Sequence, residues 1–188
     1  MNTKTRKLVG VGLFTAIVVV LQLLGGGIKL GIFSITLTLV PIVVGAALYG
    51  WQAGGILGLA FSVAVLLSGD AGAFLAVDPL ATVGVVLVKG TACGLVAGLV
   101  YKLLSKANTV AAVLAAAICA PVVNTGIFLL GCWLFFMPTI TEWAALFGFQ
   151  DATSYMFLGL AGINFLIELG VNLVLAPVIV RLIKLGRK

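Results

Sequence analysis

Long runs of apolar residues alternate with short polar or glycine- and proline-containing segments along the whole chain. Such runs predict membrane-spanning helices, because about 20 apolar residues cross the hydrocarbon core of a bilayer. The second and third runs are short for a full crossing, so either flanking residues extend them or neighbouring helices shield them. The six expected spans are residues 8–24, 35–49, 53–68, 79–104, 109–137 and 154–183.

Composition and charge agree with this pattern. Of 188 residues, 63% are hydrophobic and 9% charged, whereas soluble domains carry roughly 25% charged residues. Nine of the eleven basic residues lie at the N-terminus, in the loop after Tyr101 or at the C-terminus. The positive-inside rule places these segments in the cytoplasm. The sequence therefore predicts an all-α integral membrane protein, a six-transmembrane-helix bundle with both termini inside, as a single domain over residues 1–188.

Several classes of chemistry lack the residues that they need. The chain contains no histidine, which removes Ser-His and Cys-His nucleophile pairs and His-ligated metals. Its three cysteines, each inside an apolar run, suit small buried side chains. No Gly-x-x-x-x-Gly-Lys-[Ser/Thr] motif occurs, so ATP is not expected to bind here. The sequence predicts a protein that is not an enzyme and that needs no cofactor or metal.

The basic N-terminus and the apolar run behind it resemble a signal peptide. The run is longer than the apolar core of a signal peptide, and no clear cleavage site of small residues follows it. We therefore interpret residues 8–24 as a retained first helix.

Charged and amide side chains within the apolar spans are the candidates for function. Lys89 lies ten residues past Pro79, about 15 Å along its helix and near the middle of the bilayer. Asn164, Glu168 and Asn172 recur every four residues and form one polar stripe on the last span. We expect Lys89 to pair with Glu168 and Asn164 to face an external cavity. A purely structural pair and a substrate contact both stay open for Lys89, and for Asn172 a helix–helix hydrogen bond is favoured.

Further candidates come from the fifth span and from the longer loops. Asn124 follows Pro121 by three residues, so it either supports a kink or lines a cavity. Trp133 is either an interfacial anchor or a ligand contact. The loops opposite the basic side hold aromatic residues and single charges, which suits a binding site. The candidates in or beside these loops are Lys29, Phe74, Asp78, Trp143 and Tyr155.

Small residues follow one face of the first span. Leu8, Gly12 and Ala16 recur at four-residue spacing, a pattern that lets helices approach closely. Packing inside the bundle and contact with a partner protein both explain this face.

Three segments carry a resemblance to a known family: "SITLTLVPIVVGAALYG", "WQAGGILGLAFS" and "FLAVDPLATVGVVLVKGTACGLVAGLVYKLL". With the basic N-terminus and the small-residue first helix, the chain resembles a substrate-binding S component of an energy-coupling factor (ECF) vitamin transporter. The resemblance covers nearly the whole chain. It implies six helices with both termini inside and a location in the bacterial cell membrane.

The same resemblance implies a role and partners. S components bind a water-soluble vitamin from outside, and here Lys89, Asn124, Asn164 and the outer-loop aromatics are expected to line the pocket. The partners implied are a transmembrane coupling subunit and two cytoplasmic ATPases. The family's first helix docks on the coupling subunit through Ala-xxx-Ala motifs, in whose place Gly12 and Ala16 stand.

The ligand and one other class of function stay open at this stage. A cationic Lys89, with Lys29 attracting anions at the rim, suits a carboxylate or a phosphate. Pantothenate is preferred, and riboflavin, folate and a thiamin or pyridoxine precursor remain alternatives. The other class is a stand-alone proton-coupled carrier, or a small membrane enzyme, that uses Lys89 and Glu168.

Overall fold

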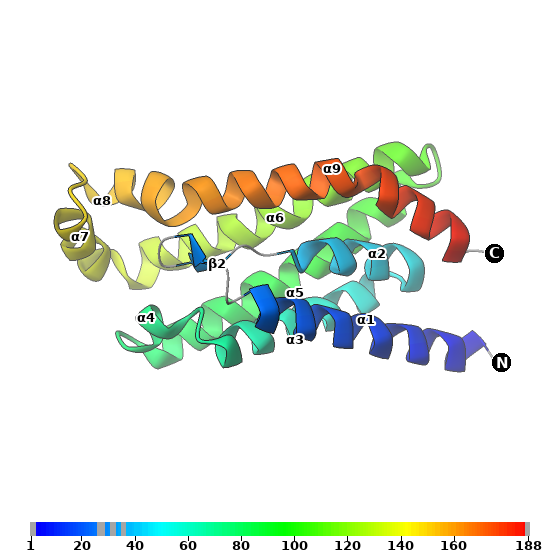
Figure 1. Ribbon diagram of the computed structural model, residues 1–188, viewed down its shortest axis with the longest axis horizontal. Helices are drawn as coiled ribbons and strands as arrows, with labels where there is room; N and C mark the ends of the chain where they lie inside the picture. Colours follow the sequence, from blue (N-terminus) through cyan, green and yellow to red (C-terminus); the bar gives the residue numbers. More distant parts are fainter. Residues whose placement is uncertain (1–2, 26–28, 31–32, 35–36, 187–188) are drawn as a thin grey trace.

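The computed structural model describes residues 3–25, 29–30, 33–34 and 37–186. Its long helices lie side by side along one axis and form a bundle (Figure 1). The bundle is formed by α1 (Thr3–Gly25), α2 (Leu39–Tyr49), α3 (Trp51–Ser68), α5 (Pro79–Leu104), α6 (Thr109–Phe135) and α9 (Ile163–Gly186). The other described elements are β1 (Lys29–Leu30), β2 (Phe33–Ser34), α4 (Gly72–Leu75), α7 (Met137–Leu146), α8 (Ala152–Ser154) and the π-helical η1 (Tyr155–Gly162).

Within the described residues, five helices are long and apolar enough to cross a membrane, and they account for five of the six expected spans. The remaining span, α2, has only 11 residues, and eight of them are buried. Neighbouring helices therefore shield α2, one of the two solutions that its short length required. By contrast, α1 is the most exposed of the long helices, with 11% of its apolar stretch buried.

The ends of α5 follow from local chemistry and agree with the predicted residues 79–104. The Asp78 carboxylate accepts a hydrogen bond from the backbone N–H of Ala81 at 3.0 Å, which caps the helix. Pro79 occupies the first turn, where its missing N–H leaves no hydrogen bond broken. Asn108 caps α6 in the same way, through the backbone N–H groups of Val110 and Ala111.

Glycines bring α3 and α5 into backbone contact. A Cβ at Gly94 would collide with the carbonyl oxygen of Gly54, and a Cβ at Gly58 would collide with that of Gly90. Two glycines on each helix thus remove the side chains that would hold the backbones apart. The Ser62 hydroxyl also donates to the Val86 carbonyl at 2.7 Å. This packing fixes the rotation of α5 and therefore the direction in which Lys89 points.

The two ends of the bundle differ in character. Both termini and the turn between α5 and α6 lie at one end (Figure 1), and most of the basic residues belong to these segments. The other end carries α4, α7 and α8 (Figure 1). Five of the described helices are long enough to cross a membrane, so a sixth crossing through α2 stays a prediction. The antiparallel pairing of β1 with β2 is a feature that the sequence did not predict.

Candidate functional site

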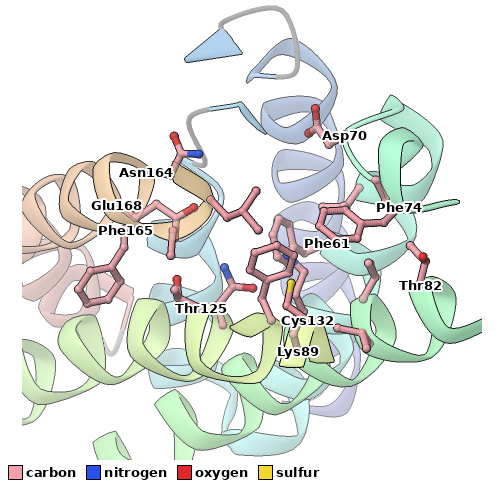
Figure 2. A pocket seen from close by; sticks show the side chains of 18 of the residues that line it. Phe61, Asp70, Phe74, Thr82, Lys89, Thr125, Cys132, Asn164, Phe165 and Glu168 are labelled. Carbon is pink, nitrogen blue, oxygen red and sulfur yellow. The ribbon is translucent and has the colours of Figure 1, made fainter. Parts of the chain in front are cut away.

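A cavity lies among α1, α3, α5, α6 and α9, toward the end of the bundle that carries α4 (Figure 2). It offers about 90 Å³ to the centre of a water molecule. One water needs only about 10–15 Å³ by this measure, so the space suits a small organic molecule. Its polar walls comprise Gln22, Asp70, Thr82, Lys89, Asn124, Thr125, Asn164 and Glu168, and its aromatic walls comprise Phe61, Phe74, Phe128, Phe136 and Phe165.

Lys89 contributes a buried cation to this cavity. Its ammonium lies over two aromatic faces, 5.8 Å from the centroid of the Phe61 ring and 5.6 Å from that of Phe128. Aromatic faces attract a cation through their quadrupole but accept few of its hydrogen bonds. The expected direct ion pair is not present: among the described residues, no carboxylate oxygen of Glu168 lies within ion-pair distance of Lys89. The two side chains nevertheless line the same cavity.

The last helix supplies Glu168 and Asn164 to the same cavity, as the polar stripe predicted (Figure 2). Glu168 is 5% exposed, and Asn164 lies one turn closer to η1. The π-helical hydrogen bonds of η1 span one residue more than α-helical ones, which changes the angular register of the side chains that follow. Asn172 lies outside the cavity and donates to the Glu168 carbonyl at 2.7 Å, within its own helix.

Asn124 and Thr125 on α6 also line the cavity, where Pro121 lies one turn earlier. Asn124 is 5% exposed, and its side-chain oxygen has no hydrogen-bond partner among the described residues. Of the two roles open from the sequence, lining a cavity is therefore the one that its position supports. The side-chain oxygen of Asn164 is likewise without a partner among the described residues.

A polar network that the sequence pattern did not indicate closes one wall of the cavity. Gln22, near the end of α1, is 3% exposed and donates a hydrogen bond to the Asp70 carboxylate. The Thr38 hydroxyl donates to the side-chain oxygen of Gln22 at 3.1 Å. The network thus joins α1, the start of α2 and the loop after α3. The available signal was a single amide, Gln22, within the apolar run of the first span.

Aromatic side chains cover the cavity on the side of α4 and α7. Phe74 on α4 lies at their centre, with its ring centroid 5.0 Å from that of Phe136, 5.6 Å from Phe128 and 5.3 Å from Trp143. Phe74 lines the cavity, and Trp143 packs behind it rather than in the lining. Phe61, Phe128 and Phe136 were not singled out from the sequence, because single phenylalanines in apolar runs carry no distinguishing pattern.

The remaining predicted candidates lie elsewhere. Trp133 is 61% exposed on the outer surface of α6, and Asp78 caps α5 beside a separate apolar groove. Tyr155 is buried but stacks on Phe147 rather than lining the cavity. Lys29 belongs to β1, and its side chain lies outside the described part of the structure.

The small residues of α1 face away from the bundle. Leu8, Gly12 and Ala16 are all exposed, and a Cβ at Gly12 would meet no atom within 4 Å in the described part of the chain. Gly10, two residues earlier, is buried, and a Cβ there would collide with the Tyr49 ring. The packing of α1 inside the bundle therefore uses Gly10, and the face with Gly12 and Ala16 remains open to lipid or to another protein.

Comparisons with known proteins agree with this architecture. A family model described as "ECF transporter, substrate-specific component" matches residues 6–180. The solved structure of ThiT from Listeria monocytogenes is similar in fold, with a TM-score of 0.69 and 22% sequence identity. That similarity covers 98% of this chain and 96% of the ThiT chain. No curated protein matches the sequence at a significant level.

Proposed function

The chain belongs to the family of ECF transporter substrate-specific components, whose members are substrate-binding subunits of transporters and not enzymes, and from this premise we propose that it captures a carboxylate-bearing vitamin from the extracellular side. The vitamin preferred is pantothenate. The chain then delivers the vitamin together with a transmembrane coupling subunit and two cytoplasmic ATPases. It acts in the bacterial cell membrane with both termini in the cytoplasm.

One observation supports capture from the extracellular side. The cavity lies toward the α4 end of the bundle, and the segments that hold most of the basic residues lie at the opposite end (Figures 1 and 2). Basic segments are retained in the cytoplasm. This arrangement supports capture of a solute from outside, with the aromatic cluster around Phe74 between the cavity and that side.

The position of Lys89 supports a ligand that bears a carboxylate. A charged ammonium at the helix centre is unfavourable by at least ~2.5 kcal/mol on insertion scales, so such residues mark functional sites by default. The ammonium here is held between Phe61 and Phe128 and lines the cavity. A carboxylate in the cavity would supply the acceptors that aromatic faces lack.

The exposed face of α1 is the proposed docking surface. Gly12 and Ala16 expose backbone along one side of the helix that the bundle leaves most open. Small residues at four-residue spacing permit close contact with a second helix in lipid. Because a Cβ at Gly12 would meet no atom of the described residues within 4 Å, the coupling subunit is the partner proposed for this face.

Ligand binding by the isolated protein tests the capture function. Purified protein in detergent or nanodiscs is titrated with pantothenate and with the other water-soluble vitamins, and native mass spectrometry identifies what co-purifies. We expect one vitamin to bind tightly with no chemical conversion. Uptake by the lone protein in liposomes under a proton gradient would instead support the stand-alone carrier.

A further inference from the structure

Unsatisfied hydrogen-bonding groups around the cavity define the ligand more closely than its overall charge does. We propose that the site selects a monoanionic carboxylate that also carries hydroxyl or amide N–H donors, with the carboxylate at Lys89 and the donors at Asn124 and Asn164. This inference rests on the proposed vitamin-capture function and narrows its substrate class.

The first element is the acceptor that Lys89 requires. An ammonium has three N–H donors, and the contacts of this one within the described chain are the rings of Phe61 and Phe128. Aromatic faces attract the charge but leave the donors without a strong acceptor. A carboxylate offers two oxygens and forms charge-assisted hydrogen bonds, about twice as strong as neutral ones.

The second element is a pair of acceptors that require donors. Asn124 on α6 and Asn164 on α9 line the cavity, and the buried side-chain oxygen of each has no hydrogen-bond partner among the described residues. Asn124 is 5% exposed, so bulk water does not replace the missing partner. A buried acceptor without a partner is unfavourable. Hydroxyl or amide N–H groups of a ligand would satisfy both oxygens, which a bare carboxylate cannot do.

The third element limits the charge of the ligand. Two carboxylates, those of Glu168 and Asp70, line the same cavity as Lys89. A phosphate ester brings up to two negative charges beside these groups, and like charges at short range disfavour each other. A single carboxylate is matched by Lys89, and hydroxyl groups on the same ligand can donate to Glu168. A cationic ligand would be repelled by the Lys89 ammonium.

The test compares ligands that differ at one functional group. Pantothenate has one carboxylate, one amide and two hydroxyls, pantothenol replaces the carboxylate with an alcohol, and 4′-phosphopantothenate adds a phosphate. We expect pantothenate to bind at least about tenfold more tightly than pantothenol, the value of one charge-assisted hydrogen bond. We expect the phosphorylated compound to bind more weakly than pantothenate. In Lys89→Met, the ratio between pantothenate and pantothenol should fall to about one.

A matched pair of amide variants tests the donor sites. Asn124→Leu and Asn172→Leu each remove a buried amide whose oxygen lacks a partner among the described residues, but only Asn124 lines the cavity. Affinity for pantothenate should fall several-fold in Asn124→Leu and stay near the wild-type value in Asn172→Leu. Equal losses in both variants would contradict the assignment. If Lys89→Met does not fold, the comparison of ligands on the wild-type protein still decides whether binding requires a single carboxylate.

The vitamin panel separates failure of this inference from failure of the capture function. Strongest binding of a monoanionic carboxylate with N–H or O–H donors, such as pantothenate or biotin, supports the class. Strongest binding of thiamin, riboflavin or a phosphorylated vitamin overturns the class and leaves vitamin capture intact. Binding of no vitamin overturns the capture function itself.

Discussion

The Gln22 side chain on α1 donates a hydrogen bond to the Asp70 carboxylate, which lines the cavity at the end of α3. Gln22 lies on the same helix as Gly12 and Ala16, which form the proposed docking surface. One helix therefore contributes both to the wall of the cavity and to the surface for the partner. A ligand that moves Asp70 would shift α1 through this bond. Docking of a partner on α1 would then change the affinity for the ligand by the same coupling free energy.

We predict that Gln22→Met weakens vitamin binding by about fivefold or more, because the Asp70 carboxylate loses a donor inside the protein. Titration calorimetry of the purified variant measures this loss. Thr38→Val is the control, since it removes a hydroxyl that contacts Gln22 but not Asp70, and its effect should be smaller. An unchanged affinity in Gln22→Met would show that the network does not hold the ligand site.

We predict that Gly12→Leu prevents assembly with the coupling subunit and leaves ligand affinity unchanged. The side chain would project into open space around α1, where it obstructs a partner helix but no part of the bundle. Co-purification with the coupling subunit and ligand titration of the isolated protein are measured together.

Gly10→Leu serves as the matched control for that substitution. Because a Cβ at Gly10 would collide with the Tyr49 ring, this variant should lose thermal stability and ligand binding even without a partner. If Gly12→Leu also loses ligand binding, its face belongs to the internal packing and the docking proposal is wrong.

Much of the helical pattern was predictable because the membrane requires it. The span at residues 79–104 agrees with α5 at both ends, since Asp78 and Pro79 form a start signal that acts locally. The β1–β2 hairpin was not predictable, because its strands have two residues each and depend on the surrounding chain. Helix α2 can be as short as 11 residues because neighbouring helices bury it. That burial is a tertiary property, which the sequence alone does not show.

The site was predictable where a polar residue interrupts an apolar helix. Lys89, Asn124, Asn164 and Glu168 were identified in this way, and the structure brings them to one cavity. Phe61 lies on the same cavity, but its sequence context is that of any core residue. The difference between Lys89 paired with Glu168 and Lys89 held between aromatic rings depends on side-chain direction, which spacing along a helix does not give.

We predict that Gly94→Ala destabilises the protein by roughly 1–3 kcal/mol or more, because the added methyl group forces α5 away from the Gly54 carbonyl. The thermal melting temperature should fall. Gly84→Ala on the same helix is the control: a Cβ there meets no atom within 4 Å, and alanine favours the helix. Equal melting temperatures for the two variants would contradict the close contact of α3 with α5.

The last prediction concerns the two charges of the cavity. A directly paired buried Lys and Glu lose ~3–5 kcal/mol when one partner is removed, and removal of both restores most of the loss. Lys89 and Glu168 lie around one cavity without a direct ion pair, so we expect Lys89→Met and Glu168→Gln to be close to additive in thermal stability. Their coupling should be about 1 kcal/mol or less.

Affinity for the carboxylate ligand should fall in Lys89→Met and stay low in the double variant, because Glu168→Gln does not restore an ammonium. Melting temperatures and ligand titrations of the three variants measure both quantities. Recovery of stability and affinity together in the double variant would show that Lys89 is a structural partner of Glu168 and not a ligand contact.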